Sequence, residues 1–199
     1  MPGPTLVLAS RSPRRRELLS RAGIPFLVRP GQVDERVLPG EDPVAHVRRL
    51  ARAKAEAAPA APGEVILAAD TVVTLDNHIL GKPAGEDDAL RMLRLLSGRA
   101  HTVLTGICLR TLSEAVVDAE ATLVRFLPLS EAEIREYVLS GEPMDKAGAY
   151  AIQGLASKFI DRVEGCYFNV VGLPVSLVYR HWRRLRIEPG PMAVRLPVL

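Results

Sequence analysis

Aromatic residues are scarce in this chain of 199 residues: phenylalanine, tyrosine and tryptophan together make up 5% of it. A core built from this chain must therefore be mainly aliphatic, and a protein that binds nucleic acid by stacking bases is not favoured. No run approaches the roughly 18 apolar residues of a membrane span. The apolar stretch before Arg11 is too short for a signal peptide core. We therefore expect a cytoplasmic protein with no membrane partner.

Cysteine is also sparse, and the signatures of several enzyme classes are missing. The two cysteines, Cys108 and Cys166, lie far apart without metal-ligand spacing, so we expect both to be reduced. No Walker A pattern, no Gly-rich dinucleotide fingerprint and no Ser-His-Asp set is present. These absences argue against a cysteine-ligated metal centre, a P-loop enzyme and a serine hydrolase.

The charges are unevenly distributed along a chain that is otherwise typical of globular proteins, with 48% hydrophobic and 25% charged residues. Residues 1–60 contain eleven Lys and Arg against six Asp and Glu, whereas residues 61–179 contain ten against sixteen. The formal net charge is only +3. A basic first third beside an acidic middle suits a polyanionic ligand held together with a metal cation.

The first loop carries the strongest local anomaly. The apolar run Thr5–Ala9 predicts a short buried strand, and Ser12 followed by Pro13 predicts the start of a helix. Arg14, Arg15 and Arg16 then occupy the first helical turn, where the helix dipole disfavours each cation by about 0.3–1 kcal/mol. Free amides and guanidinium groups at one helix start favour a bound anion such as phosphate. A solvated basic turn is the alternative interpretation.

Carboxylates occur at two informative places. Asp34 and Glu35 lie together on a loop, where they are either solvated surface or ligands of a metal or a reacting water. Asp70 interrupts the nearly continuous apolar stretch Val65–Leu75, which is typical of a buried strand. An unpaired carboxylate there is expensive to desolvate, so we expect Asp70 beside a cation or metal, or at a strand break that opens on a pocket. A structural cap at such a break is the alternative.

Three polar side chains outside the first loop could reach a ligand. A helix predicted from Val44 to about Ala58 places Lys54 on its apolar face, where it either snorkels or reaches into a cleft. Lys82 lies between Gly81 and Pro83 on a loop. Gln153 belongs to the long connection from Gly141 to Gly154, and its amide could read a base edge.

The remaining patterns predict a mixed α/β fold. Short strands are expected at Phe26–Val28 and Ile79–Leu80. Helices are expected at Glu86–Leu96, from the capping box at Ser130 to Ser140, and from Pro174 to about Leu185. Two hairpins are expected, one pairing His101–Arg110 with Glu114–Arg125 and the other pairing Phe159–Val163 with Tyr167–Val171. We expect an elongated mixed β-sheet with flanking helices in one domain over residues 1–188, followed by a Pro-rich tail at 189–199.

Taken together, the candidate polar groups suit hydrolysis of a nucleotide phosphoanhydride. Cations spread the charge of a triphosphate, carboxylates hold a divalent cation, and one carboxylate deprotonates water. The candidate anion holders are Ser10, Arg14, Arg15, Lys54 and Lys82, and the candidate carboxylates are Glu35 and Asp70.

Six motifs, in order along nearly the whole chain, resemble those of the Maf family of nucleoside triphosphate pyrophosphatases. Each motif is weak alone, but together they are highly specific. They are L-A-S-x-S-P-R-R-x-E-L-L (Leu8–Leu19), A-A-D-T-V-V (Ala68–Val73), G-K-P (Gly81–Pro83), S-G-x-x-H-x-V-x-T-G (Ser97–Gly106), G-E-P-x-D-K-A-G-A-Y-x-I-Q-G (Gly141–Gly154) and N-V-V-G-L-P (Asn169–Pro174).

The resemblance implies a fold and a reaction. The fold would be two-lobed like that of inosine-triphosphate pyrophosphatases, with a cleft between the lobes. The reaction would cleave a nucleoside triphosphate between the α and β phosphates with a divalent metal such as Mg²⁺ or Mn²⁺. A homodimer is a further implication, while nucleic acid is not an expected partner.

The resemblance also assigns roles to single residues. Asp70 would be the general base, with Glu35 as its metal or water partner, so that both would ligate the metal. The phosphates would be held by Ser10, Arg14, Arg15, Lys54 and Lys82. The identities at three positions that separate the branches of the family, Arg14, Thr71 and Gln153, resemble the branch that acts on dTTP and UTP rather than the 7-methyl-GTP branch. A pyrimidine edge can be met by one amide and one guanidinium, whereas a methylated purine favours stacking area.

Two alternatives remain at this point. One is 7-methyl-GTP pyrophosphatase activity within the same family. The other is a non-enzymatic protein that docks nucleic acid or a division protein on its basic first third, for which strongly salt-dependent binding and no hydrolysis would be expected.

Overall fold

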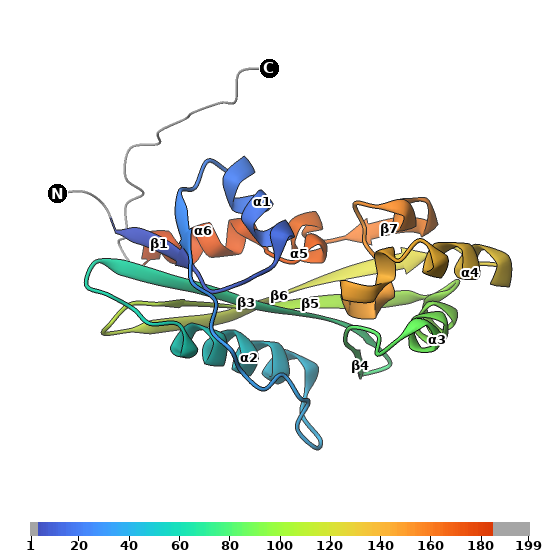
Figure 1. The fold of residues 1–199 in the computed structure, drawn as a ribbon, viewed down its shortest axis with the longest axis horizontal. Helices are drawn as coiled ribbons and strands as arrows, with labels where there is room; N and C mark the ends of the chain where they lie inside the picture. Colours follow the sequence, from blue (N-terminus) through green and yellow to red (C-terminus); the bar gives the residue numbers. More distant parts are fainter. Residues whose placement is uncertain (1–3, 185–199) are drawn as a thin grey trace.

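A computed structural model describes residues 4–184 of the chain, and its centre is a mixed seven-stranded β-sheet (Figure 1). The strand order is β2-β1-β3-β5-β6-β7, with β4 pairing β3 away from this path. The strands are β1 Thr5–Leu8, β2 Phe26–Val28, β3 Glu64–Leu75, β4 His78–Leu80, β5 Ala100–Arg110, β6 Ala115–Phe126 and β7 Ile160–Glu164. The α/β class and the mixed sheet expected from the sequence are confirmed.

Helices cover both faces of this sheet (Figure 1). The helix α2 lies on one face, while α1, α5 and α6 lie on the other, and α3 and α4 gather at one end. The bounds are α1 Pro13–Arg21, α2 Pro43–Ala57, α3 Glu86–Leu96, α4 Glu131–Leu139, α5 Tyr167–Val171 and α6 Val175–Arg184, with 3₁₀ turns η1 Glu142–Asp145, η2 Ala147–Ala149 and η3 Leu155–Phe159. The expected capping box is present at α4, where Ser130 and Glu133 cap each other's backbone.

The core is aliphatic, as the composition predicts. Its largest cluster fills the space between the sheet and the helices α1, α3, α4 and α6, and a smaller alanine-rich cluster lies under α2. Cys108 belongs to the second cluster, and burial raises the pKa of its thiol to about 11, so it is a packing residue rather than a nucleophile. Both cysteines are free thiols.

The edge of β3 is interrupted in its middle, and this interruption positions the site. The strand β1 pairs in parallel with residues 64–67 of β3, and β4 pairs antiparallel with residues 73–75. Residues 68–72 therefore have no strand on that edge, although β5 pairs with them on the other edge. Asp70 lies at the centre of this gap. Because side chains alternate along a strand, Asp70 faces α2 while Thr71 faces α1 and α5.

The second predicted hairpin is wrong. Residues 167–171 form the helix α5, and β7 instead pairs antiparallel with the end of β6. The reason is the buried Asn169, whose amide nitrogen donates to the carbonyl of Val103 at 2.9 Å and to the Thr122 hydroxyl at 3.0 Å. These tertiary contacts to β5 and β6 outweigh the β-propensity of the valines that follow Asn169.

The helix α2 approaches the sheet unusually closely at Gly106, the residue opposite Asp70 on β5. A Cβ atom at Gly106 would lie 2.2 Å from the carbonyl oxygen of Val47 on α2. No real Cβ contact is that short, and the neighbour is backbone, which cannot rotate away. Glycine at this position therefore permits the approach that brings Lys54, also on α2, to Asp70.

Gly106→Ala is expected to destabilise the protein by about 1–3 kcal/mol, because the added methyl group must push α2 away from the sheet. Urea unfolding of the purified variant measures this as a lower midpoint. Gly81→Ala is the matched control, since a Cβ there meets nothing within 4 Å and the backbone is not left-handed. Equal midpoints for the two variants would contradict the close approach.

Two expectations concern the ends and the membrane. Within residues 4–184, no helix is long and apolar enough to cross a membrane. The Pro-rich tail at 189–199, and with it the boundary of the domain at residue 188, lies outside the described residues, as does Leu185 at the expected end of the last helix.

Candidate active site

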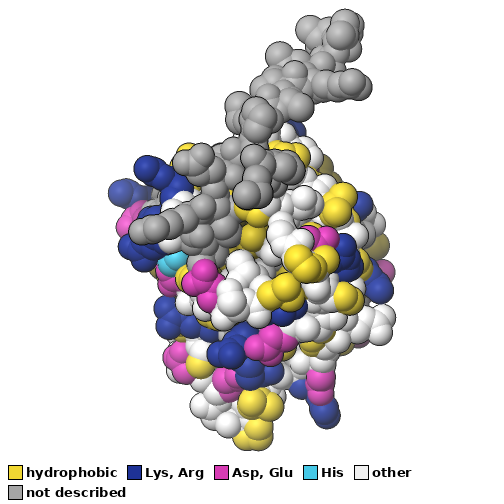
Figure 2. Space-filling model, turned by 90° about the vertical axis from the view of Figure 1, so that its left-hand side faces the viewer, with side chains coloured by type: hydrophobic (Ala, Val, Ile, Leu, Met, Phe, Trp, Pro, Cys, Tyr) yellow, Lys and Arg dark blue, Asp and Glu magenta, His cyan; other side chains and the backbone are white. Residues whose placement is uncertain are grey.

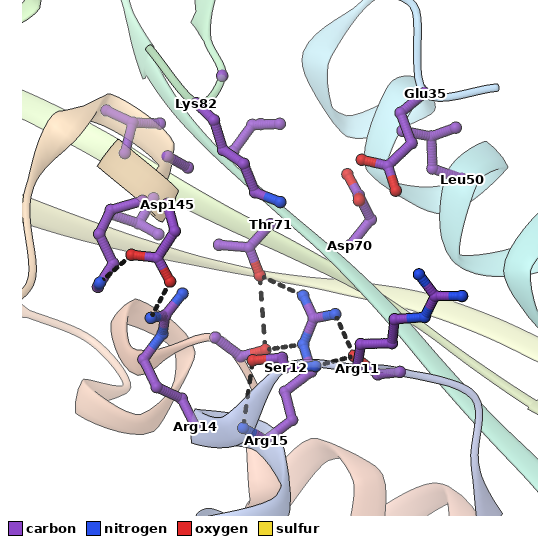
Figure 3. Close-up of a pocket in the computed structure, with 18 of the residues that line it drawn as sticks. Arg11, Ser12, Arg14, Arg15, Glu35, Leu50, Asp70, Thr71, Lys82 and Asp145 are labelled. Carbon is purple, nitrogen blue, oxygen red and sulfur yellow. Dashed lines mark hydrogen bonds and ion pairs between the residues drawn. The ribbon is translucent and has the colours of Figure 1, made fainter. Parts of the chain in front are cut away.

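The site is a single cavity of about 890 Å³ that opens at the gap in β3. Its walls come from the loop before α1, the loop before α2, the centre of β3, the loop after β4, and the connection between α4 and η3 (Figure 3). All nine residues that the sequence nominates for the site line this cavity: Ser10, Arg14, Arg15, Glu35, Lys54, Asp70, Thr71, Lys82 and Gln153.

On the α2 side of the cavity, two carboxylates converge on one ammonium group. The Nζ atom of Lys54 lies 2.6 Å from Oδ1 of Asp70 and 2.8 Å from Oε1 of Glu35. The Asp70 and Lys54 side chains are largely buried, whereas Glu35 is about half exposed. Lys54 therefore reaches into the cleft instead of snorkelling to the surface, and it compensates the charge of Asp70 that the strand would otherwise bury unpaired.

The Glu35 carboxylate is held in its ionised form. Partial burial alone would raise its pKa, but the hydrogen bond from Lys54 and the charges of Lys54, Lys82 and Arg15 outweigh burial, and the net pKa is lowered. Glu35 therefore carries a negative charge at neutral pH. It can accept hydrogen bonds or ligate a cation, but it is a poor proton donor.

The loop that carries Glu35 is anchored to α2 by Glu41, a residue that no motif in the sequence singles out. Its buried carboxylate accepts from the Arg49 guanidinium, from the backbone N–H of Leu38 at 3.1 Å, and pairs with Nδ1 of His46 at 2.9 Å. The Arg49 hydrogen bond is the main reason that the pKa of Glu41 falls to about 2. Nothing in the local pattern distinguishes Glu41 from a solvated acid before a helix, so only the fold reveals this anchor.

At the start of α1, Ser12 caps the helix as predicted. Its hydroxyl accepts from the Arg15 backbone N–H at 3.5 Å, and Pro13 occupies the first turn. The Ser10 hydroxyl accepts from the backbone N–H of Ser12 at 3.2 Å, which fixes the loop between β1 and α1. The positive end of α1 therefore points into the cavity beside Arg14 and Arg15 (Figure 3).

The Arg15 guanidinium is largely committed to the protein itself. It donates to the carbonyls of Gly172 and Ala69, both at 2.8 Å, to the Ser10 hydroxyl at 3.2 Å and to the Thr71 hydroxyl at 3.1 Å. Four of its five N–H donors are thus in use. The Ala69 carbonyl belongs to the unpaired part of the β3 edge, so Arg15 supplies the hydrogen bond that a neighbouring strand would give. Burial lowers the pKa of Arg15, while Asp70 opposes this effect.

Two further cations face the carboxylates across the cavity (Figure 3). Arg14 extends from α1 to Asp145 of η1, with 3.3 Å between its Nη1 atom and Oδ2 of Asp145. Asp145 also forms an ion pair with the adjacent Lys146. Lys82 points toward Thr71, and among the described residues its ammonium has no hydrogen-bond partner. The sequence predicts Arg14 and Lys82 as site residues, but no local pattern indicates the contact of Arg14 with Asp145, because the two residues are 131 positions apart.

Sequence comparison places the chain among known proteins. Residues 5–185 match the family model described as Maf-like protein. The chain belongs to the Maf family. The resemblance inferred from the six motifs is thereby confirmed.

Several Maf relatives are similar over most of their length. A protein of Koribacter versatilis is 51% identical over 183 residues, which cover 92% of this chain and 95% of the relative. A protein of Anaeromyxobacter dehalogenans strain 2CP-C is 56% identical over 177 residues, 87% of this chain and 90% of the relative. One from Syntrophomonas wolfei is 53% identical over 175 residues, 86% of this chain and 93% of the relative. All three relatives are named dTTP/UTP pyrophosphatase.

Proposed function

We propose that this protein is a nucleoside triphosphate pyrophosphatase that hydrolyses dTTP and UTP, and modified pyrimidine nucleotides, to the monophosphate and pyrophosphate. The observation that carries the proposal is the composition of the one cavity at the β3 gap. Two converging carboxylates lie on one side, and cationic groups and a helix N-terminus lie on the other. The names of the similar Maf proteins support the choice of substrate.

In the proposed reaction, a water oxygen attacks the α phosphorus and the bond to the bridging oxygen of the β phosphate breaks. Asp70 accepts the proton of this water on a carboxylate oxygen, while Lys54 holds the other side of the carboxylate. The side chains of Arg14 and Lys82, with the Arg14 backbone N–H at the positive end of α1, neutralise the phosphate oxygens, including the charge that develops on the leaving pyrophosphate. Arg15 has one free N–H donor for a phosphate and otherwise positions Ser10, Thr71 and Gly172.

The donor set fits a divalent cation that arrives with the nucleotide. Glu35 and Asp70 lie close together, since each places one carboxylate oxygen against the Lys54 ammonium, and the second oxygen of each makes no hydrogen bond among the described residues and could ligate a cation. Magnesium commonly takes one or two carboxylates together with phosphate oxygens, so no third protein carboxylate is required. Residues 4–184 contain no cluster of three metal-ligating side chains. When bound, Mg²⁺ or Mn²⁺ would polarise the phosphoryl oxygens, with Glu35 and Asp70 as its protein ligands.

The base is proposed to contact Gln153 and Arg14. Gln153 is exposed at the rim of the cavity, and its amide offers both a donor and an acceptor to a pyrimidine edge. The Thr71 hydroxyl is already bonded to Arg15, to Thr105 at 2.9 Å and to the Gly172 carbonyl. We therefore assign Thr71 to positioning Arg15 rather than to direct contact with the base.

One panel tests this function: pyrophosphate release from about a dozen canonical and modified triphosphates, with Mg²⁺, with Mn²⁺ and with a chelator. We expect dTTP and UTP to be turned over fastest and the chelator to abolish turnover. Faster turnover of 7-methyl-GTP would contradict the pyrimidine assignment but leave the reaction intact. Absence of hydrolysis, with salt-dependent binding of DNA or RNA, would favour the docking alternative.

The face drawn in Figure 2 gives no support to that docking alternative. On the face seen in Figure 2, acidic and basic side chains are interspersed, and no continuous basic surface is visible. Location in the cytoplasm and assembly as a homodimer remain predictions from the sequence and the resemblance. Gel filtration with light scattering would test the second.

A further inference from the structure

The turn that carries Gln153 is fixed by a carboxylate to which the proposed mechanism gives no part. This carboxylate belongs to Glu142, the first residue of η1. Its Oε2 atom accepts from the backbone N–H of Leu155 at 3.0 Å. Its Oε1 atom accepts from the hydroxyl of Tyr137 at 2.8 Å. Both oxygens are therefore occupied by donors from segments that flank the cavity.

The same carboxylate also controls the other end of the turn. The Tyr137 hydroxyl, while donating to Glu142, accepts from the backbone N–H of Ala151 at 3.1 Å. Within the turn, the Gly154 N–H donates to the Ala151 carbonyl at 3.1 Å. Glu142 thus holds residues 151–155 at both ends, directly at Leu155 and through one phenol at Ala151. Gln153 lies between these two points.

The approach between Glu142 and the turn is as close as the backbone allows. A Cβ atom at Gly154 would lie 2.1 Å from Oε2 of Glu142, so a larger residue there would displace this carboxylate from its place beneath the turn. The backbone at Gly154 is not left-handed, so the glycine matters here for space rather than for its φ angle.

The chemistry of the three groups specifies a carboxylate. Burial and the hydrogen bond to Glu142 raise the pKa of Tyr137, so its phenol remains a donor. Glu142 therefore faces two donors, one O–H and one N–H, and needs two acceptors. No cation pairs with its carboxylate among the described residues, although the Lys146 ammonium donates to the Glu142 backbone carbonyl at 3.2 Å. A glutamine could not replace it in full, because one of its two terminal atoms is an NH2 donor that cannot accept from either group.

We propose that Glu142 is a positioning residue that determines base selectivity by fixing where the Gln153 amide meets the pyrimidine. The inference rests on the proposed function, in which Gln153 contacts the base. Glu142 touches neither the phosphates nor the carboxylates of the reaction, so its loss affects nucleotide binding at the base and leaves the chemical step in place. The expected signature is a higher KM for UTP with a nearly unchanged kcat.

The test compares kcat/KM for UTP and GTP in Glu142→Gln, Gln153→Ala, the double variant and Glu136→Gln. The last is the matched control, an exposed glutamate on α4 next to Tyr137 that undergoes the same change in charge. Tyr137→Phe provides a second route to the same network, because it removes only the hydroxyl from a ring that otherwise stays in the core. Thermal melting shows that each variant is folded at the assay temperature.

We expect the UTP-to-GTP ratio of kcat/KM to fall about three- to tenfold in Glu142→Gln, in Tyr137→Phe and in Gln153→Ala, corresponding to the loss of about one hydrogen bond. The double variant should fall no further than Gln153→Ala, because Glu142 acts through Gln153. Glu136→Gln should match the wild type.

Two results would overturn the inference while leaving the pyrophosphatase function intact. The first is a wild-type ratio in Glu142→Gln alongside a reduced ratio in Gln153→Ala. The second is a double variant whose loss is the product of the two single losses. An unchanged ratio in Gln153→Ala would remove the base contact on which the inference depends. If the wild-type protein hydrolysed neither UTP nor GTP, the proposed function itself would be refuted.

Discussion

Asp70→Asn is expected to slow pyrophosphate release from UTP by about 10²–10⁴-fold, because an amide cannot accept the proton of the attacking water. Nucleotide binding should survive, since Arg14, Lys82 and the start of α1 are unchanged. The measurement is steady-state pyrophosphate release at saturating UTP, together with UTP affinity by calorimetry. The asparagine carbonyl can still accept from Lys54, which limits any structural disturbance.

The neighbouring acid Asp34 supplies the control for this experiment. It is exposed and pairs with Arg36 at 2.6 Å, away from the Lys54 ammonium. Asp34→Asn should keep nearly the full rate. Turnover of Asp70→Asn at the wild-type rate would show that another group deprotonates the water, and Glu35→Gln would then be the next variant to examine.

Arg15→Lys is expected to lower kcat/KM by about 10²-fold and to destabilise the protein by about 2–4 kcal/mol. Lysine keeps the charge but replaces a planar fork of five donors with one ammonium, which cannot span four separated acceptors. The carbonyls of Ala69 and Gly172 would lose their charged partner. Asp70 and Thr71 follow Ala69 directly on β3, so a small displacement of this strand misplaces the proton acceptor.

Arg16→Lys is the corresponding control, because Arg16 is the next residue on α1, is exposed, and makes no side-chain hydrogen bond among the described residues. Its stability and rate should match those of the wild type. If Arg15→Lys also retained wild-type stability and only the affinity for nucleotide decreased, the main role of the guanidinium would be to bind phosphate rather than to hold β3 and the Gly172 loop together.

Much of the fold could be predicted from the sequence because the strong periodic patterns and caps are local. Pro13 and Pro43 each stand at the first position of a helix, and the apolar run around Asp70 is a buried strand. The sequence predicts a strand for the α5 segment because its valines favour extended structure. The hydrogen bonds of Asn169 that make it a helix come from β5 and β6, more than 40 positions away.

The residues of the site could also be predicted from the sequence, but the hydrogen bonds and ion pairs that join them could not. A carboxylate inside an apolar strand signals a polar pocket, and the cations at the start of α1 signal an anion. Nothing local distinguishes Arg14, which faces the cavity, from Arg15, which donates to four protein acceptors. Glu41 and Glu142 cannot be recognised as anchors from the sequence for the same reason: each has the local pattern of an ordinary surface acid, and its donors come together only in the folded chain.

The missing stretch of the β3 edge has a consequence for how substrate range can change. The gap in the β3 edge is bounded by the ends of β1 and β4, so its length is set by backbone register rather than by the size of any side chain. Register changes in whole residues, about 3.3 Å at a time, and a slip of β4 by one residue would turn Leu80 out of the core. Single substitutions can therefore change which groups line the rim, while the length of the gap along β3 stays constant.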